Sequence, residues 1–334
     1  MNRVLSAVRA PRSVTGWRRA ACCLEWGQSL RFAVRFGMAC CLLLLELTTA
    51  TLTGQTTTDA KSTALRQAIE RKLQTIAESV DGVMGYEIVD LTGGARFGRL
   101  QDEMFPTAST VKLAILYELF KQADEGQLRL DEVRALDARH RVGGSGVLVD
   151  LAAPSMPLRD YAMLMVVLSD NTATNVLIDL LGMQRVTARM EGLGLKATKL
   201  RRRMIDIEAA RRGDENVSTP AEISRLLELL YRGDGLTKES REGLLGILKK
   251  SKSSPMRRSI PAAVQVANKP GTLEGVAVDA GIVYVERRPY IFTAMLTYLN
   301  DNTAGDAAIE SASHAVFEYF TRLAASSEYG RAIR

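Results

Sequence analysis

The sequence predicts an α+β fold, in which an antiparallel sheet formed from both ends of the chain packs with helices, and an all-helical lobe is inserted between the strands. Strand-like alternation of apolar and polar residues occurs in residues 82–100 and returns after residue 262. The residues between these segments are mostly helical in periodicity, and a further helical segment follows the last strand. Strands at both ends with helices between them indicate that the terminal halves share one sheet.

The first 50 residues differ in composition from the rest of the chain. This stretch holds all four cysteines, both tryptophans and seven arginines. Its basic part ends at Arg35, and the apolar run 36–54 that follows is short and interrupted by Glu46, which is typical of an export signal rather than of a membrane span. We therefore expect residues 1–50 to be a signal peptide, or an N-terminal anchor if they are not cleaved, and residues 51–62 to be a threonine-rich linker.

Composition also limits the partners and cofactors. The net charge of +6 comes mostly from the first 50 residues, so the remainder has no concentrated basic face for a nucleic acid. No cysteine lies beyond Cys41, and the two histidines, His140 and His314, are far apart in the sequence, so a metal site would have few ligands. We expect an exported, periplasmic or secreted monomer that acts on a small molecule without cofactor or metal. It would contact a membrane only through a retained leader.

The domain body, residues 63–325, begins with a helix, a hairpin and a second helix. Residues 63–79 place Leu65, Ile69, Leu73 and Ile76 at helical spacing. Residues 82–100 form two alternating strands around a turn at Gly93 and Gly94. The segment from Phe105 to Asp124 then enters a long apolar helix that ends before Gly126.

The inserted lobe is expected at about residues 126–260. Within it, Thr219 is predicted to cap a helix that has Pro220 at its first position, with Glu222 completing a capping box. Three strands and a closing helix follow, and residues 326–334 form a tail. The strands are expected at 262–268, 279–286 and 290–299, and the helix at about 305–324. A cleft between the sheet and the lobe is a natural place for a site.

Ser109 and Lys112 form the first motif whose residue types could carry out catalysis. They stand three positions apart at the start of the apolar helix, so both side chains lie on one face and the amine can reach the hydroxyl. Burial disfavours the ammonium and lowers its pKa, which would make Lys112 a base for the Ser109 nucleophile. The alternative, non-catalytic interpretation is a serine near a helix start and a lysine whose aliphatic stem packs along the core.

Two further polar motifs follow. Ser169, Asp170 and Asn171 lie between two apolar helical runs; these residue types favour helix caps, but Ser169 could also pass protons to a leaving group and Asn171 hold a substrate amide. Lys269 begins a Lys-Pro-Gly-Thr segment at a predicted strand end. It could be a plain turn, or Lys269 could bind a substrate carboxylate while the Thr272 N–H donates to an oxyanion.

In this order the three motifs resemble the signature of the penicillin-recognising serine hydrolases, most closely class A β-lactamases, over about residues 63–325. The resemblance implies the β-lactamase/transpeptidase-like fold and an acyl-enzyme reaction on a β-lactam or a peptidoglycan-derived substrate. The implied catalytic residues are Ser109, Lys112 and Ser169. The implied substrate-binding residues are Asn171, Lys269, Gly271 and Thr272, with the N–H groups of Ser109 and Thr272 holding the oxyanion.

The sequence departs from the family pattern at two places. Class A enzymes carry a glutamate, followed four residues later by an asparagine, in a loop before a Gly-Asp turn, but here the place of that glutamate falls at about Met204. Asp206 and Glu208 are nearby but out of register, and are expected to pair with neighbouring arginines. Pro270 replaces a hydroxyl residue of the third motif. Acylation is therefore supported, whereas fast deacylation is in doubt.

Three functions follow from this pattern. The first is a serine β-lactamase-like hydrolase. The second is a D-alanyl-D-alanine peptidase or an esterase with the same nucleophile. The third is a slowly deacylating penicillin-binding sensor, which takes one acyl group and stops.

Overall fold

The computed structural model describes residues 60–152, 154–327 and 329–333. The expected leader, residues 1–50, and most of the linker lie outside the described residues. Helix α2 (Ala60–Glu78) already includes residues 60–62, so the predicted linker was three residues too long. Its first residues, Ala60 and Lys61, are strong helix formers and extend the helix toward the N-terminus. Within the described part of the chain, no helix has the length and apolar character needed to cross a membrane.

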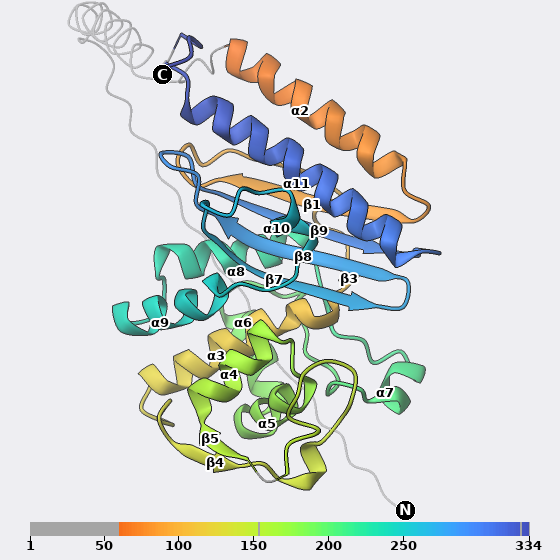
Figure 1. Cartoon of the computed structure of the whole chain (residues 1–334), viewed down its shortest axis with the longest axis vertical. Coiled ribbons are helices and arrows are strands. Elements are labelled where there is room, and N and C mark those ends of the chain that lie inside the picture. The colour runs from red at the N-terminus through yellow and green to blue at the C-terminus, as the bar shows by residue number, and fades with distance from the viewer. Residues whose placement is uncertain (1–59, 153, 328, 334) are drawn as a thin grey trace, which may run out of the picture. The chain divides into compact units, whose positions relative to one another are not determined.

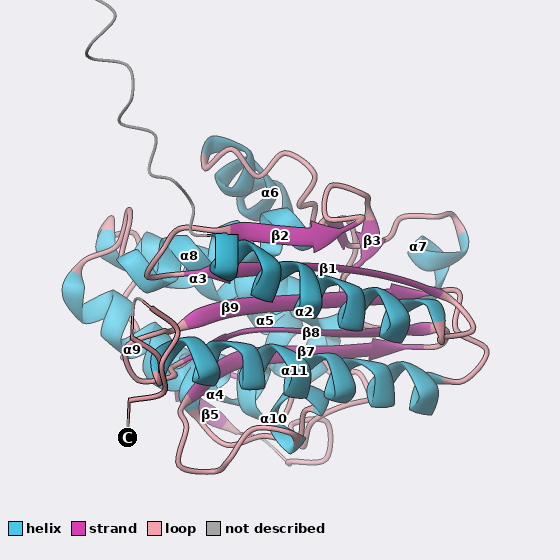
Figure 2. Ribbon diagram, turned by 90° about the horizontal axis from the view of Figure 1, so that it is seen from above, coloured by secondary structure: helices cyan, strands magenta, loops and turns pink. Residues whose placement is uncertain are grey.

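Five antiparallel strands form the central sheet, in the order β2-β1-β9-β8-β7. They are β1 (Val83–Asp90), β2 (Arg96–Arg99), β7 (Val266–Leu273), β8 (Val276–Val283) and β9 (Tyr290–Thr297). The N-terminal strand β1 pairs directly with the C-terminal strand β9, where Tyr86 lies opposite Ala294. The prediction that both ends of the chain share one sheet is therefore confirmed, as is the hairpin of β1 and β2 (Figure 2).

Helices cover both faces of this sheet (Figure 1). On the outer face, α2 and α11 (Asn302–Ala324) lie side by side and contact each other. The short α10 (Pro255–Arg258) packs between α11 and β8. Their core includes Leu73 and Phe320, and the Phe320 ring stacks on Tyr290 of β9 with 4.3 Å between ring centroids. This layer confirms the predicted first and last helices.

The inner face carries α8 (Pro220–Arg232) and, beyond it, the inserted lobe. The lobe helices are α3 (Lys112–Asp124), α4 (Leu158–Val167), α5 (Asn171–Leu181), α6 (Met183–Gly192) and α7 (Ile207–Arg211). Helix α8 packs on β9 and β1 and belongs to the sheet layer, whereas α9 (Lys238–Lys249) packs on β7 and also on α3 and α4 of the lobe. The predicted lobe, about residues 126–260, therefore takes in α8, which covers the sheet, because helical periodicity alone does not say which partner a helix covers.

The lobe is also not all-helical. Strands β4 (Val133–Ala135) and β5 (Ser155–Pro157) pair as a small antiparallel sheet. A second pair joins β3 (Phe105–Pro106) to β6 (Val217–Ser218) and fixes the chain just before the first motif. Strands of two or three residues are too short to produce a detectable alternation, which explains why the sequence pattern did not reveal them.

The start of α8 confirms half of the predicted capping box. The Thr219 hydroxyl caps the helix by accepting the N–H of Glu222, with Pro220 in the first turn. The Glu222 carboxylate, however, does not return to the backbone of Thr219. It accepts the N–H groups of Ala197 and Thr198 at 2.8 and 2.7 Å. Backbone donors in a partly buried loop need a partner, and Glu222 supplies it.

The third motif occupies the second half of a strand and stops one residue before its end, so it is not a turn. Residues Lys269 and Thr272 both belong to β7, where Pro270 is opposite Asp279 of β8. The turn instead follows Leu273. Proline lacks a backbone donor and is tolerated because β7 is an edge strand of the sheet. The Pro-Gly pair, a strong turn signal, was thus misleading at this position.

Candidate active site

Ser109 lies on a short 3₁₀ turn, Ala108–Val111, that leads directly into α3. The preceding Ala108 has a positive φ of 46°, a conformation that costs energy for a residue with a Cβ atom. On the other side, the Thr110 hydroxyl donates to the Lys269 carbonyl at 3.2 Å and ties the turn to β7. The serine therefore lies between α3 of the lobe and the edge strand β7 of the sheet.

Lys112 begins α3 and is completely buried. Its Nζ donates to the Ser169 carbonyl at 2.7 Å, to Ser169 Oγ at 3.1 Å and to Asn171 Oδ1 at 3.0 Å. The direct contact expected with Ser109 is not among these hydrogen bonds of the described residues. The amine is directed to the second motif because three acceptors there satisfy its three donors.

Ser169 connects the groups of the site. Its Oγ lies 2.9 Å from Ser109 Oγ and 3.1 Å from the Nζ atoms of both Lys112 and Lys269. Ser169 occupies the loop between α4 and α5 and has a positive φ of 53°. A non-glycine residue in that conformation is retained where the surrounding structure over-determines it, and such residues cluster at functional sites.

Asp170 and Asn171 hold the loops around Ser169. Asp170 caps α5 through the Ala173 N–H, which confirms the predicted cap, and also accepts the N–H groups of Val147 and Leu148. The Asn171 side chain donates to the Gly143 carbonyl at 3.1 Å while accepting from Lys112. The second motif therefore fixes the glycine-containing loop 143–148 as well as the lysine.

Strand β7 brings the third motif against the nucleophile. Gly271 passes so close that a Cβ atom there would lie 2.7 Å from the Ser109 nitrogen, so only glycine fits. Lys269 is 1% exposed and donates to Ser169 Oγ and to the Pro270 carbonyl at 2.7 Å. Thr272, by contrast, is exposed at the mouth of the site.

Burial sets the electrostatics of the two lysines. Desolvation holds the pKa of Lys112 well below its usual range, and the nearby Lys269 charge lowers it further. Desolvation also lowers the pKa of Lys269 to about 7, against the opposing attraction of Asp279. Burial therefore favours the neutral form of both amines, which is the form that a general base requires.

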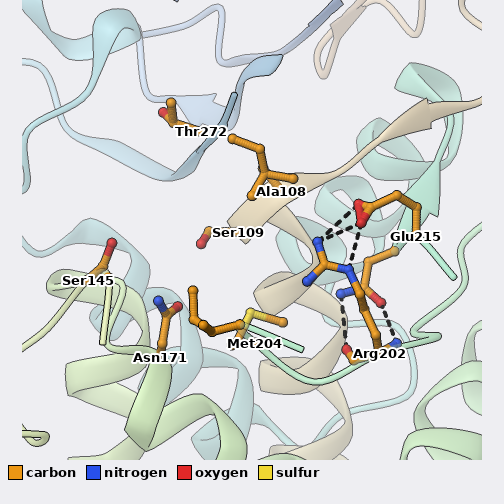
Figure 3. Close-up of a pocket in the computed structure, with 12 residues that line it drawn as sticks. Ala108, Ser109, Ser145, Asn171, Arg202, Met204, Glu215 and Thr272 are labelled. Atoms are coloured by element: carbon orange, nitrogen blue, oxygen red, sulfur yellow. Dashed lines mark hydrogen bonds and ion pairs between the residues drawn. The ribbon is translucent and has the colours of Figure 1, made fainter. Parts of the chain in front are cut away.

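A cavity of about 180 Å³ opens in front of Ser109 (Figure 3). Of the predicted site residues, Ser109, Asn171 and Thr272 line it, whereas Lys112, Ser169 and Lys269 are not part of its lining. The other lining residues are Ala108, Gly144, Ser145, Arg202, Met204, Ile205, Glu215, Asn216 and Leu273.

Met204 occupies the place where the family pattern has a glutamate. Its side chain lines the cavity and lies between Asn171 and Arg202 (Figure 3). Neither Asp206 nor Glu208 reaches the cavity lining. Glu208 pairs with Arg211 at 2.7 Å, as expected, but the Asp206 carboxylate caps α7 through the Ala209 N–H instead of pairing with an arginine.

Sequence reasoning missed the one acid that lines the cavity in the described part of the chain. Glu215 forms a two-point ion pair with Arg202, with contacts of 2.6 and 3.1 Å (Figure 3). It also missed Gly144 and Ser145 of the facing loop. The paired glycines in that segment were a signal of a loop, but nothing in the pattern predicted that this loop would face Ser109. No cluster of three or more histidine, cysteine or acidic side chains in the described residues has the geometry of a metal site.

Comparisons with known proteins show which family the chain resembles. A family model described as the beta-lactamase enzyme family matches residues 68–320. The imipenem-hydrolyzing beta-lactamase of Enterobacter cloacae is 25% identical over 240 residues, which cover 70% of this chain and 82% of that protein. Beta-lactamase AST-1 of Nocardia asteroides is 28% identical over 266 residues, covering 78% and 86%.

Solved structures show the same relationship. The beta-lactamase of Sphaerobacter thermophilus superimposes with a TM-score of 0.70 at 29% identity, covering 75% of this chain and 96% of that one. PBP-A also gives a TM-score of 0.70, at 26% identity and with 76% and 96% coverage. An L158E mutant of PBP-A has been solved as an acyl-enzyme complex with penicillin-G, and it is 27% identical to this chain, with a TM-score of 0.70 and 77% and 96% coverage.

Proposed function

The chain belongs to the beta-lactamase enzyme family, and from this premise we propose that it is a serine hydrolase that opens the β-lactam amide through an acyl-enzyme on Ser109. The observation that carries the proposal is the continuous hydrogen-bond path from Ser109 Oγ through Ser169 Oγ to the buried amine of Lys112. A serine hydroxyl is a weak nucleophile until a base takes its proton, and this path provides one.

In the acylation step, Ser109 Oγ bonds to the lactam carbonyl carbon. Its proton passes to Ser169 Oγ, and the proton of Ser169 passes to the neutral Lys112 amine. The resulting oxyanion would be held by the Ser109 and Thr272 N–H groups, in the way that such donors act in other acyl-transfer enzymes. The C–N bond then breaks, and the departing nitrogen receives the proton from Lys112 through Ser169.

The remaining predicted residues would bind the substrate. Asn171 lines the cavity and would contact the amide of the acyl side chain. Lys269, next to Ser169, would attract the substrate carboxylate when protonated. Because Pro270 supplies no hydroxyl for that carboxylate, the exposed Thr272 would provide it. Water finally attacks the ester carbon, the bond to Ser109 Oγ breaks, and the acid leaves.

A slowly deacylating penicillin-binding sensor is another candidate. Met204 would make deacylation slow, because a thioether cannot take a proton from the attacking water. The Glu215 carboxylate would not replace it, because it is paired with Arg202. Such a protein would complete the first step and stop at the acyl-enzyme.

One time course separates these functions. Purified protein is mixed with benzylpenicillin, and intact mass spectrometry follows the adduct, with Ser109→Ala as the control. A transient adduct with continuous product release supports the hydrolase, whereas a stoichiometric adduct that persists supports the slow binder. Absence of both an adduct and hydrolysed product with the wild-type protein would refute both.

The role of Met204 has its own test. In Met204→Glu, a carboxylate beside the acyl group can accept a proton from water, so the adduct should decay at least about tenfold faster than in wild type. Met204→Gln is the matched control, since it has nearly the same shape without the charge. Equal decay of the two variants would show that this position does not limit deacylation.

The remaining candidate, a D-alanyl-D-alanine peptidase or esterase, uses the same nucleophile on another carbonyl. Hydrolysis of a peptidoglycan stem peptide or of a p-nitrophenyl ester, with negligible lactam turnover, would favour it. In each case we propose that the protein is exported and monomeric. Cell fractionation and light scattering check these two points.

A further inference from the structure

Ile205 has an unfavourable backbone conformation at the edge of the cavity. Its φ is 60°, and a β-branched residue is a true outlier in this left-handed region. Its side chain is also 45% exposed, so burial in the core does not offset that cost. Residues in strained backbone conformations persist where the surrounding structure over-determines them, and they cluster at active sites and ligand-binding sites.

The neighbouring residues explain the turn but not the isoleucine. Met204 is fixed on both sides by Asn175, whose amide donates to its carbonyl at 3.2 Å and accepts its N–H at 2.9 Å. Asp206 is fixed as the cap of α7. The backbone must therefore turn at position 205, where glycine or asparagine would fit at lower cost. Compared with glycine or asparagine, isoleucine adds a branched apolar side chain at the cavity.

That side chain reaches across to the facing loop. A Cβ atom placed on Gly144 would lie 3.2 Å from Ile205 Cδ1 and 2.9 Å from Asn171 Nδ2. Ile205 therefore approaches the loop of residues 143–148. It does so beside the Asn171 side-chain amide, which we propose contacts the acyl side chain of the substrate. Together with the adjacent Met204, it contributes apolar side-chain surface to the lining of the cavity that Ser109 also lines.

We propose that Ile205 is a specificity-determining residue, which packs against the acyl side chain of the substrate and selects β-lactams whose acyl group is bulky and apolar. The inference rests on the proposed acylation of Ser109 and adds the substrate class. Loss of an apolar contact with one isoleucine side chain weakens the binding of the ligand by roughly tenfold, because both apolar surfaces then stay exposed to water.

The test compares two penicillins that differ only in this group. Benzylpenicillin carries an aromatic acyl side chain, and 6-aminopenicillanic acid carries none. The second-order rate of adduct formation on Ser109 is measured by mass spectrometry for wild type and Ile205→Asn, since asparagine tolerates the backbone conformation. We expect the rate with benzylpenicillin to fall about tenfold and the rate with 6-aminopenicillanic acid to change less than twofold, while Ile205→Leu retains most of the preference.

Leu100 provides the matched control for backbone strain. It also has a positive φ, 48°, and an exposed side chain, but it does not line the cavity. Leu100→Asn should leave both rates unchanged. Equal losses with both penicillins in Ile205→Asn, or no loss with either, would overturn the inference. If neither penicillin labels wild-type Ser109, the proposed function fails as well.

Discussion

At the scale of single residues, the base and the nucleophile are connected through a third side chain. Lys112 and Ser109 both contact Ser169 Oγ, so a proton can move between them without a direct hydrogen bond. The environment of Lys112 matters as much as this geometry. Desolvation holds its pKa well below the usual range and keeps a neutral amine available for acylation.

Replacement of the base tests this arrangement. Lys112→Met keeps the volume of the buried stem but removes the amine, and we expect the rate of Ser109 acylation by benzylpenicillin to fall about 10²- to 10⁴-fold. Lys121→Met, on the same helix but at its more exposed end, is the control and should acylate normally. A Lys112→Met protein that acylates within threefold of wild type would exclude the amine as the base.

The pH dependence follows from the direction of the same pKa shift. Lys112 is active when neutral, so the wild-type acylation rate should rise with pH along a limb whose midpoint lies well below 10.5. The limb attributed to Lys112 should be missing in Lys112→Met. Persistence of an identical limb would assign it to another group.

Sequence reasoning found the residues whose spacing carries information and missed those that depend on loop conformation. Ser109, Ser169 and Lys269 come from three separate segments, yet each sits in a recognisable motif. Ile205 and Glu215 have no such motif. They face the cavity because of a left-handed turn and an ion pair, and neither can be read from residue types alone.

At the scale of elements, one carboxylate joins the loop 143–148 to α5. Asp170 accepts the N–H of Ala173 at the helix start and those of Val147 and Leu148 from the loop. Gly146 permits this contact, since a Cβ atom there would lie 2.1 Å from Asp170 Oδ2. Packing of the loop on α5 therefore depends on these hydrogen bonds.

Asp170→Asn should weaken this connection. The amide replaces one acceptor oxygen by a donor, so at least one backbone N–H loses its partner, at a cost of about 1–3 kcal/mol in the free energy of unfolding. Urea unfolding measures the change. Asp150→Asn, in the same stretch but with an exposed side chain, is the control. A stability equal to that of wild type would show that water replaces the bonds at no cost.

Element boundaries show where the sequence pattern stops being sufficient. The periodicity of α2 and α11 predicted both helices to within a few residues, because each has one apolar stripe over a long span. Strand β7 extended through a Pro-Gly pair because its edge position needs fewer backbone donors. Edge position is a property of the assembled sheet and is not visible in the strand itself.

At the scale of the whole molecule, one sheet separates two cores. The outer core lies beneath α2 and α11, and the inner core joins α3, α5 and α8. Pairing of β1 with β9 connects the start of the body to its end, so the sheet cannot be completed until most of the chain is present. The sequence predicted this architecture because the strand patterns occur only at the two ends.

Buried lysines should make the stability of the whole molecule depend on pH. Lys252 donates to the carbonyls of Leu248 and Lys250, and desolvation, reinforced by Arg257, lowers its pKa to about 7. In the unfolded chain, a lysine titrates near 10.5. Between these values the unfolded state binds more protons than the folded state, so the free energy of unfolding rises with pH from about 7 toward 10.5.

Lys252→Met isolates this contribution, because Lys252 is not part of the proposed site. From pH 7 to pH 9 the wild-type free energy of unfolding, measured in urea, should rise by about 1–2 kcal/mol more than that of the variant. Taking the difference between the two proteins removes the titration of the groups that do not interact with Lys252. Parallel pH profiles would mean that Lys252 remains charged in the folded state. The two carbonyls at the end of α9 would then compensate fully for its desolvation.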